Sequence, residues 1–181
     1  LITKNGQHKL LLEFPVLTEK ILLKVGISAV DIEGAKTNLA KEIPAWDMNI
    51  LRLQTIKKWN EELNKIDFFS EDHDVMVKFY TSLYHSFLNP NIFSDVDGRY
   101  RGRDKKIHTL PENDKQYSVF SIWDTYRGTH PLFTITQEKR TNEFIRTFLR
   151  QYDEGGDLPV WELAGNETEC MIGYHSVSVI S

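Results

Sequence analysis

The ten residues that end at Cys170 hold the densest group of chemically capable side chains in this 181-residue sequence. They run Trp161-Glu-Leu-Ala-Gly-Asn-Glu-Thr-Glu-Cys170 and include three carboxylates, one amide and one indole. Carboxylates suit general acid and base catalysis or calcium binding, and an indole offers a flat apolar face on which a sugar ring can stack. The structural alternative is that Thr168 or Glu169 caps a following helix while Trp161 lies in the core.

A second candidate is the stretch Ser121-Ile-Trp-Asp-Thr-Tyr-Arg-Gly-Thr-His130. Asp124 and Arg127 stand three residues apart inside the most apolar helix that the sequence predicts, and buried charges need partners. The two side chains could therefore form a structural ion pair. Alternatively, Asp124 lies at the mouth of a cleft and binds ligand hydroxyls, with Gly128 allowing the close approach of a neighbouring helix.

A third candidate, residues 89–102, resembles a calcium-binding EF-hand loop only in part. Its glycine comes too early, and no glutamate closes the loop. The plainer interpretation is a turn with Asp97-Gly98 at its tip, a dipeptide typical of hairpins. Asp95 could still line a cleft.

Composition limits the class of protein. The length of 181 residues predicts one domain, or one plus a piece of another, and 40% hydrophobic with 27% charged residues is ordinary for a folded globular chain. A net charge of −4 without a dense block of Lys and Arg argues against a nucleic-acid partner. The single cysteine excludes an internal disulfide and a Cys-based zinc site. No apolar run approaches the ~18 residues of a membrane span. We also expect the chain to be an excerpt of a longer protein.

Hydrophobic spacing predicts strands first and helices afterwards. Within residues 8–30, two alternating runs joined by Pro15–Lys20 indicate two strands. Helical spacing and capping residues then predict helices over about 32–43, 48–66, 71–88, 121–135 and 141–153, with a sixth starting near residue 169 or 170. This order fits stacked helical hairpins in two layers.

Five stretches in this order resemble glycoside hydrolase family 92, the bacterial calcium-dependent exo-acting α-mannosidases. They are Val25–Ser28 with Ala35–Leu39, Phe79–His85, Pro90–Gly98 with Tyr100–Gly102, Phe120–Thr125, and Pro159–Thr168 with Met171–Ser176. The resemblance runs from about residue 21 to the end of the chain.

The resemblance implies an architecture. Members of the family carry an N-terminal β-sandwich, a helical linker and an (α/α)6 toroid. We therefore expect a mainly α fold, in which a partial toroid follows the last strands of a sandwich. Residues 1–30 would end the sandwich, residues 31–68 would form the linker, and residues 69–181 would begin the catalytic domain.

The resemblance also implies an activity. The family removes terminal α-linked mannose from glycans with inversion, and here the α-1,2 linkage is expected. Calcium would bind the 2- and 3-hydroxyls of the mannose. Inversion needs an acid and a base carboxyl roughly 6.5–9.5 Å apart, and no residue here matches either one. Both, like most calcium ligands, are expected beyond residue 181, so the excerpt alone should be inactive. The parent protein would be periplasmic or extracellular and would degrade N-glycans.

Two of the matching motifs place residues at the sugar pocket. One is Trp123-Asp124-Thr125, in which Asp124 is the expected ligand of sugar hydroxyls. The other is Gly165-Asn166-Glu167, with Trp161 and Glu162 just before it. The expected substrate-binding residues are therefore Trp123, Asp124, Trp161, Glu162, Asn166 and Glu167.

Two other classes of protein remain alternatives. A carbohydrate-binding module would keep the sugar pocket but hydrolyse nothing. A helical interaction scaffold would use Asp124 and Arg127 as an internal pair, so that loss of the Asp124 charge would change stability and no sugar affinity.

Overall fold

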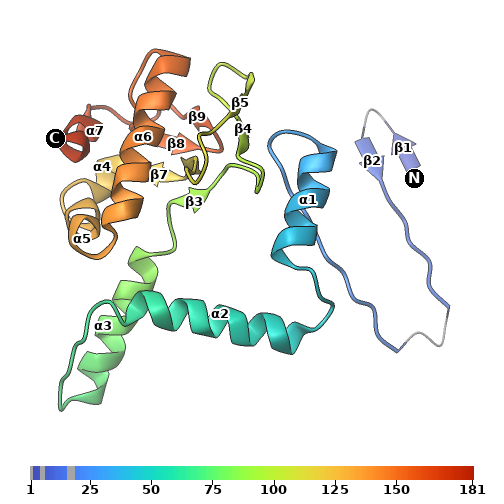
Figure 1. The fold of residues 1–181 in the computed structure, drawn as a ribbon, viewed down its shortest axis with the longest axis horizontal. Coiled ribbons are helices and arrows are strands. Elements are labelled where there is room, and N and C mark those ends of the chain that lie inside the picture. The colour runs from blue at the N-terminus through green and yellow to red at the C-terminus, as the bar shows by residue number, and fades with distance from the viewer. Residues whose placement is uncertain (1, 5–6, 16–18) are drawn as a thin grey trace.

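The computed structural model describes residues 2–4, 7–15 and 19–181, which form a mainly helical chain with short antiparallel strands (Figure 1). The helices are α1 (Ile32–Glu42), α2 (Met48–Leu63), α3 (His73–Ser86), α4 (Ile122–Thr125), α5 (Thr129–Thr136), α6 (Glu138–Gly155) and α7 (His175–Ile180). The strands are β1 (Ile2–Lys4), β2 (Gln7–Lys9), β3 (Asn91–Ile92), β4 (Arg99–Arg101), β5 (Ile107–Thr109), β6 (Tyr117–Ser118), β7 (Phe120–Ser121), β8 (Trp161–Leu163) and β9 (Asn166–Glu167). In the described part of the chain, no helix has the length and apolar character needed to cross a bilayer.

The first helices begin where local capping chemistry predicts. The Asp31 carboxylate accepts the backbone N–H of Gly34 at 2.6 Å and caps α1. Asp47 accepts the N–H groups of Asn49 and Ile50 and caps α2. These bonds satisfy N–H groups that have no partner inside the helix, so the starts of α1 and α2 follow from sequence alone.

Of the two strands expected within residues 8–30, only residues 8–9 lie in a strand, as the end of β2, and the second strand is wrong. The described residues 10–15 and 19–30 contain no strand, and residues 16–18 of the expected connection lie outside the described residues. The strands that do occur near the N-terminus are β1 and β2, which pair only over residues 2–9. Alternating apolar residues form a strand only when a neighbour completes the ladder, and here Leu23 and Ile27 remain 78% and 80% exposed.

The single helix expected over residues 121–135 is divided into α4 and α5. Pro131 lacks the N–H that would bond to the carbonyl of Arg127, and its ring would clash with that carbonyl in a continuous helix. The chain therefore turns after α4 and restarts at Thr129, behind Gly128.

The last helix starts later than expected. Glu169 has a φ of +55° and Gly173 a φ of +108°, and these left-handed backbone angles exclude a helix through residues 169–173. α7 begins at His175, so neither Thr168 nor Glu169 caps it.

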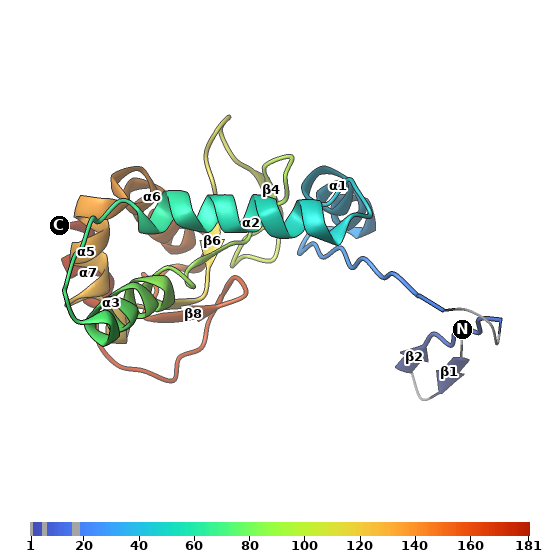
Figure 2. The same ribbon diagram turned by 90° about the horizontal axis from the view of Figure 1, so that it is seen from below.

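The core lies between α6 and the short strands. Phe144 and Phe148 of α6 meet Phe120 edge to face, with ring centroids 5.7 and 4.8 Å apart. Ile122 and Phe133 complete this cluster from α4 and α5. Burying each such side chain stabilises the fold by about 1.5–3 kcal/mol. The C-terminal end of α2 meets the start of α6 through Glu62 and Arg140, and the rest of α2 extends away towards α1. The β1–β2 hairpin lies apart from the core in both views (Figure 2).

The turn expected at Asp97-Gly98 is present. Gly98 adopts a φ of +84° and donates its N–H to the carbonyl of Asp95 at 2.9 Å. The hairpin that follows it, β4–β5, turns instead at residues 102–106. Asp95 is 3% exposed and accepts hydrogen bonds from Ser28 and Asn38, so it holds two segments together and does not line a cleft.

Candidate functional site

One small sheet brings the two main candidate motifs together. β8 pairs antiparallel with β7, with Ser121 opposite Trp161, and it pairs on its other side with β9. The pairing continues into α4, because the N–H of Ile122 donates to the carbonyl of Val160 at 3.0 Å. Trp123 and Asp124 are thereby fixed next to the strand that carries Trp161, although about 40 residues separate them in sequence.

Asp124 offers an open carboxylate. Its side chain is exposed and accepts a hydrogen bond from the Ser121 hydroxyl. Over the described residues, no ion pair joins Asp124 to Arg127, whose guanidinium instead lies 5.1 Å from the centroid of the Tyr126 ring. The internal pair required by the scaffold alternative is therefore not formed, and the Asp124 carboxylate can accept further hydrogen bonds from a ligand.

Glu167 organises the backbone beneath Trp161. Its carboxylate accepts the N–H groups of Val160 at 2.8 Å, Trp161 at 3.0 Å and Thr168 at 3.1 Å. The Thr168 hydroxyl donates to the Trp161 carbonyl at 2.7 Å. Four hydrogen bonds thus fix the position from which the Trp161 indole projects.

Glu162 is fully buried, with 0% of its surface exposed. Its carboxylate accepts hydrogen bonds from the Ser118 hydroxyl and from the N–H groups of Val119 and Gly165. Burial raises the pKa of this carboxyl to about 7, and these hydrogen bonds oppose the rise because they favour the ionised form.

The six side chains expected to bind substrate therefore differ in access. Asp124 and Asn166 are exposed, Trp123, Trp161 and Glu167 are half-buried, and Glu162 is enclosed. The sheet gathers all six at one place in the fold. Their contact with a substrate stays a prediction.

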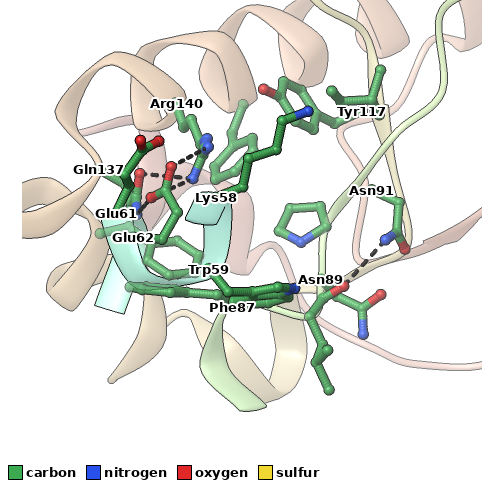
Figure 3. Close-up of a pocket in the computed structure, with 15 residues that line it drawn as sticks. Lys58, Trp59, Glu61, Glu62, Phe87, Asn89, Asn91, Tyr117, Gln137 and Arg140 are labelled. Atoms are coloured by element: carbon green, nitrogen blue, oxygen red, sulfur yellow. Dashed lines mark hydrogen bonds and ion pairs between the residues drawn. The ribbon is translucent and has the colours of Figure 1, made fainter. Parts of the chain in front are cut away.

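A cavity lies apart from these six residues, between α2, the chain after α3, and α5–α6 (Figure 3). The sequence did not indicate it. It measures about 690 Å³, and none of the six expected residues lines it. Trp59 and Phe87 form part of its wall. Apolar residues at helical spacing form the same sequence pattern whether their side chains face a core or a cavity. No sequence signal could therefore have revealed this cavity.

A charged cluster closes one end of this cavity. Arg140 donates to both carboxylate oxygens of Glu62, at 2.7 and 3.0 Å, and Gln137 donates to the same group at 2.7 Å. Burial would raise the pKa of Glu62, but hydrogen bonds from Lys65, Gln137 and Arg140 outweigh it and lower the pKa to about 2. Glu62 thus stays ionised and pins α2 to the start of α6.

Within residues 2–4, 7–15 and 19–181, the side chains do not form a calcium site. The described residues contain no group of three or more His, Cys, Asp or Glu side chains placed to hold a metal ion. Calcium takes six to eight oxygen ligands, mostly carboxylates and carbonyls. No step through calcium is therefore assigned to these side chains.

Comparison with known proteins decides the family. Residues 34–181 match the glycosyl hydrolase family 92 catalytic domain. The chain belongs to this family. The resemblance inferred from the motifs is confirmed, and the family 92 match covers all the helices that the structure describes except the first two residues of α1.

Two solved family 92 structures show the same fold. The GH92 alpha-mannosidase BT3965 from Bacteroides thetaiotaomicron is 44% identical, with a TM-score of 0.79. It has also been solved in complex with mannoimidazole. The GH92 inverting mannosidase BT2199 from the same species is 27% identical, with a TM-score of 0.77.

These matches cover 84% of this chain but only 20% and 21% of BT3965 and BT2199. The chain thus spans about a fifth of the length of these relatives. No curated protein matches it.

Proposed function

We propose that this chain is part of an exo-acting, inverting α-mannosidase that removes terminal α-linked mannose, preferentially α-1,2-linked, from glycans. The observation that carries the proposal is the 44% identity to the alpha-mannosidase BT3965 over 84% of the chain. Inversion is supported by the likeness to BT2199, which is an inverting mannosidase. α3–α7 would belong to the first part of an (α/α)6 toroid, after a linker over residues 31–68 and the end of a β-sandwich over residues 1–30.

In this proposal Asp124 accepts hydrogen bonds from the hydroxyls of the bound mannose. A carboxylate is a strong acceptor for such donors, and the bond from Ser121 orients it before substrate arrives. The indoles of Trp123 and Trp161 supply apolar faces for the sugar ring, and Asn166 supplies an exposed amide. These groups bind and orient the sugar, which lowers the entropic cost of reaching the transition state.

The acid and base are not assigned to this chain. An inverting glycosidase needs two carboxyls roughly 6.5–9.5 Å apart, so that water fits between the base and the sugar. Glu162 is enclosed and Glu167 is engaged by four backbone N–H groups, so neither is free for that work. Calcium belongs to the proposal as a requirement of the whole protein, as does a periplasmic or extracellular location with N-glycans as substrates.

The test is mannose release from α-1,2-mannobiose by the full-length protein, with calcium and then with excess chelator. We expect release that the chelator abolishes and that added calcium restores. The 1,3, 1,4 and 1,6 isomers, assayed in parallel, would define the linkage. A protein that binds mannose but releases none from any isomer would instead be a carbohydrate-binding module.

A further inference from the structure

Val119 has a strained backbone just before the strand that leads to Asp124. Its φ is +69°, in the left-handed region that β-branched residues rarely adopt. It lies between β6 and β7, two residues before Ser121. Such a conformation persists only when its surroundings enforce it, and it is often found at functional sites.

The carboxylate of Glu162 provides that enforcement. Its Oε2 accepts the N–H of Val119 at 3.0 Å, and its Oε1 accepts the hydroxyl of Ser118 at 3.0 Å. The same Oε1 accepts the N–H of Gly165 at 2.5 Å, in the β8–β9 turn, where Ala164 and Gly165 also have positive φ angles of +51° and +82°. One buried side chain therefore ties two irregular backbone segments together.

Both segments lead directly to the candidate sugar pocket. Beyond Val119, β7 carries Ser121, which bonds Asp124 and lies opposite Trp161. Beyond Gly165, β9 carries Asn166 and Glu167. The β7–β8 pairing places the segment of Asp124 beside Trp161, and the Glu162 carboxylate holds the two irregular backbone segments that flank this pairing.

We propose that Glu162 is a positioning residue, whose buried carboxylate fixes Val119 and Gly165 and thereby holds Asp124 and Trp161 in the arrangement that binds mannose. It does this without touching the sugar, in contrast to the direct contact expected from the family resemblance. This proposal rests on the proposed function. The chemistry needs a carboxylate, since three donors converge on it and an apolar side chain would leave all three unpaired.

The test compares Glu162→Gln with Glu143→Gln in the full-length protein. Glutamine keeps the shape of Glu162, but its NH2 group cannot accept a hydrogen bond. At least one of the backbone or hydroxyl donors around it therefore loses its acceptor. Glu143 is a matched control, because it is also a buried carboxylate of this core and accepts the Tyr117 hydroxyl at 2.6 Å. No hydrogen bond joins its side chain to β7, β8 or β9 in the described parts of the chain.

Steady-state kinetics with α-mannobiose separate positioning from general damage. A variant that is only less stable lowers the amount of active enzyme, which reduces the apparent kcat and leaves KM unchanged. We expect Glu162→Gln to raise KM about tenfold, because misplaced sugar contacts weaken binding. We expect Glu143→Gln to leave KM unchanged. An unchanged KM in Glu162→Gln, or an equal rise in both variants, would overturn the proposal.

Amide hydrogen exchange provides a readout that needs no activity. The N–H groups of Val119 and Gly165 should exchange faster in Glu162→Gln than in the wild type, and the Gly165 N–H should keep its wild-type rate in Glu143→Gln. Unchanged exchange at both amides in Glu162→Gln would overturn the positioning role even if KM changed. If the wild-type protein hydrolyses no mannoside, the proposed function fails, while this measurement still tests the network.

Discussion

The carboxylate of Asp95 accepts a hydrogen bond from the Asn38 amide at 2.7 Å, across 57 residues of sequence. Its other oxygen accepts the Ser28 hydroxyl at 2.7 Å, and Asn38 in turn accepts the N–H of Val96 at 2.9 Å. These contacts join the segment before α1, α1 itself and the turn before β4. Two of the stretches that resemble family 92 therefore meet at one buried carboxylate.

Removing the Asn38 amide should destabilise the protein. Asn38→Ala leaves the nearly enclosed Asp95 carboxylate without one donor, and it leaves the Val96 N–H without its acceptor. We expect the free energy of unfolding to fall by about 1–3 kcal/mol, measured by denaturant titration. Asp97→Asn is the control, because Asp97 pairs with Arg99 near the surface and should cost less than about 1 kcal/mol. Equal losses in both variants would contradict the role of Asn38.

Gly34 should not tolerate a methyl group. A Cβ at this position would collide with the Asp95 carboxylate and the Ser28 hydroxyl. Gly34→Ala should therefore lower the free energy of unfolding by about 1–3 kcal/mol, because α1 or Asp95 must shift. Gly128→Ala is the matched control, since a Cβ there meets no atom within 4 Å. A Gly34→Ala protein as stable as the control would show that the space between Gly34 and the Asp95 carboxylate can hold a methyl group.

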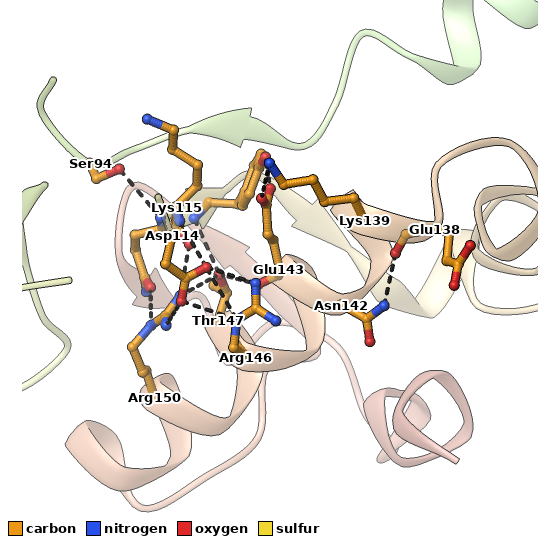
Figure 4. A network of polar contacts seen from close by, with 12 residues as sticks. Ser94, Asp114, Lys115, Glu138, Lys139, Asn142, Glu143, Arg146, Thr147 and Arg150 are labelled. Carbon is orange, nitrogen blue, oxygen red and sulfur yellow. Dashed lines mark hydrogen bonds and ion pairs between the residues drawn. The ribbon is translucent and has the colours of Figure 1, made fainter. Parts of the chain in front are cut away.

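Asp114 should make stability depend on pH in the acidic range. Arg146 and Arg150 of α6 converge on its carboxylate, at 2.9 and 2.8 Å (Figure 4). Burial alone would raise the pKa of Asp114, but the hydrogen bonds from the two arginines lower it from 3.8 to about 2. A carboxyl with a lowered pKa in the folded protein stabilises it above the unfolded pKa, and this stabilisation is lost as pH falls.

Unfolding of the wild type and of Asp114→Asn between pH 7 and pH 2 tests this account. At pH 7 the wild type should be more stable by about 2 kcal/mol, the energy that corresponds to this difference in pKa. The gap should close between about pH 4 and pH 2. A gap that stays constant over this range would mean that the two arginines do not act through the charge of Asp114.

The Asp124 carboxylate should matter for substrate and little for stability. Asp124→Asn removes the charge from an exposed side chain, so the free energy of unfolding should change by less than about 0.5 kcal/mol. The value of kcat/KM for α-mannobiose should fall by about 10²-fold if the carboxylate holds the sugar hydroxyls. Asp153→Asn, an exposed carboxylate on α6, should leave kcat/KM unchanged. Wild-type kcat/KM in Asp124→Asn would remove this residue from the sugar pocket.

Local chemistry made part of the fold predictable. The carboxylates of Asp31 and Asp47 bond to backbone N–H groups within three residues, so the starts of α1 and α2 were readable from sequence. The apolar run around Leu23 has the pattern of a strand but forms none, because a strand depends on a partner that no local pattern reveals. The apolar spacing over residues 121–135 is continuous and does not show the break before α5, whereas Pro131 does indicate it.

Of the candidate site, the sequence could predict which segments carry it, while the contact of their side chains with a sugar stays a prediction. The matching motifs predict Asp124 and Trp161 as site residues, and the register of β7 against β8 brings their segments together. The burial of Glu162 was not readable, because it depends on Ser118 and Val119, more than 40 residues earlier. A carboxylate next to an indole looks the same in sequence whether it faces a sugar or the core.

Inversion can be tested most directly by proton NMR, which shows which anomer of mannose the full-length protein releases first from an α-mannoside. An inverting α-mannosidase delivers water to the face opposite the leaving group, so β-mannose should appear first and then equilibrate to the α-anomer. Release of α-mannose first would contradict inversion, and release of no mannose would contradict the proposed hydrolase activity.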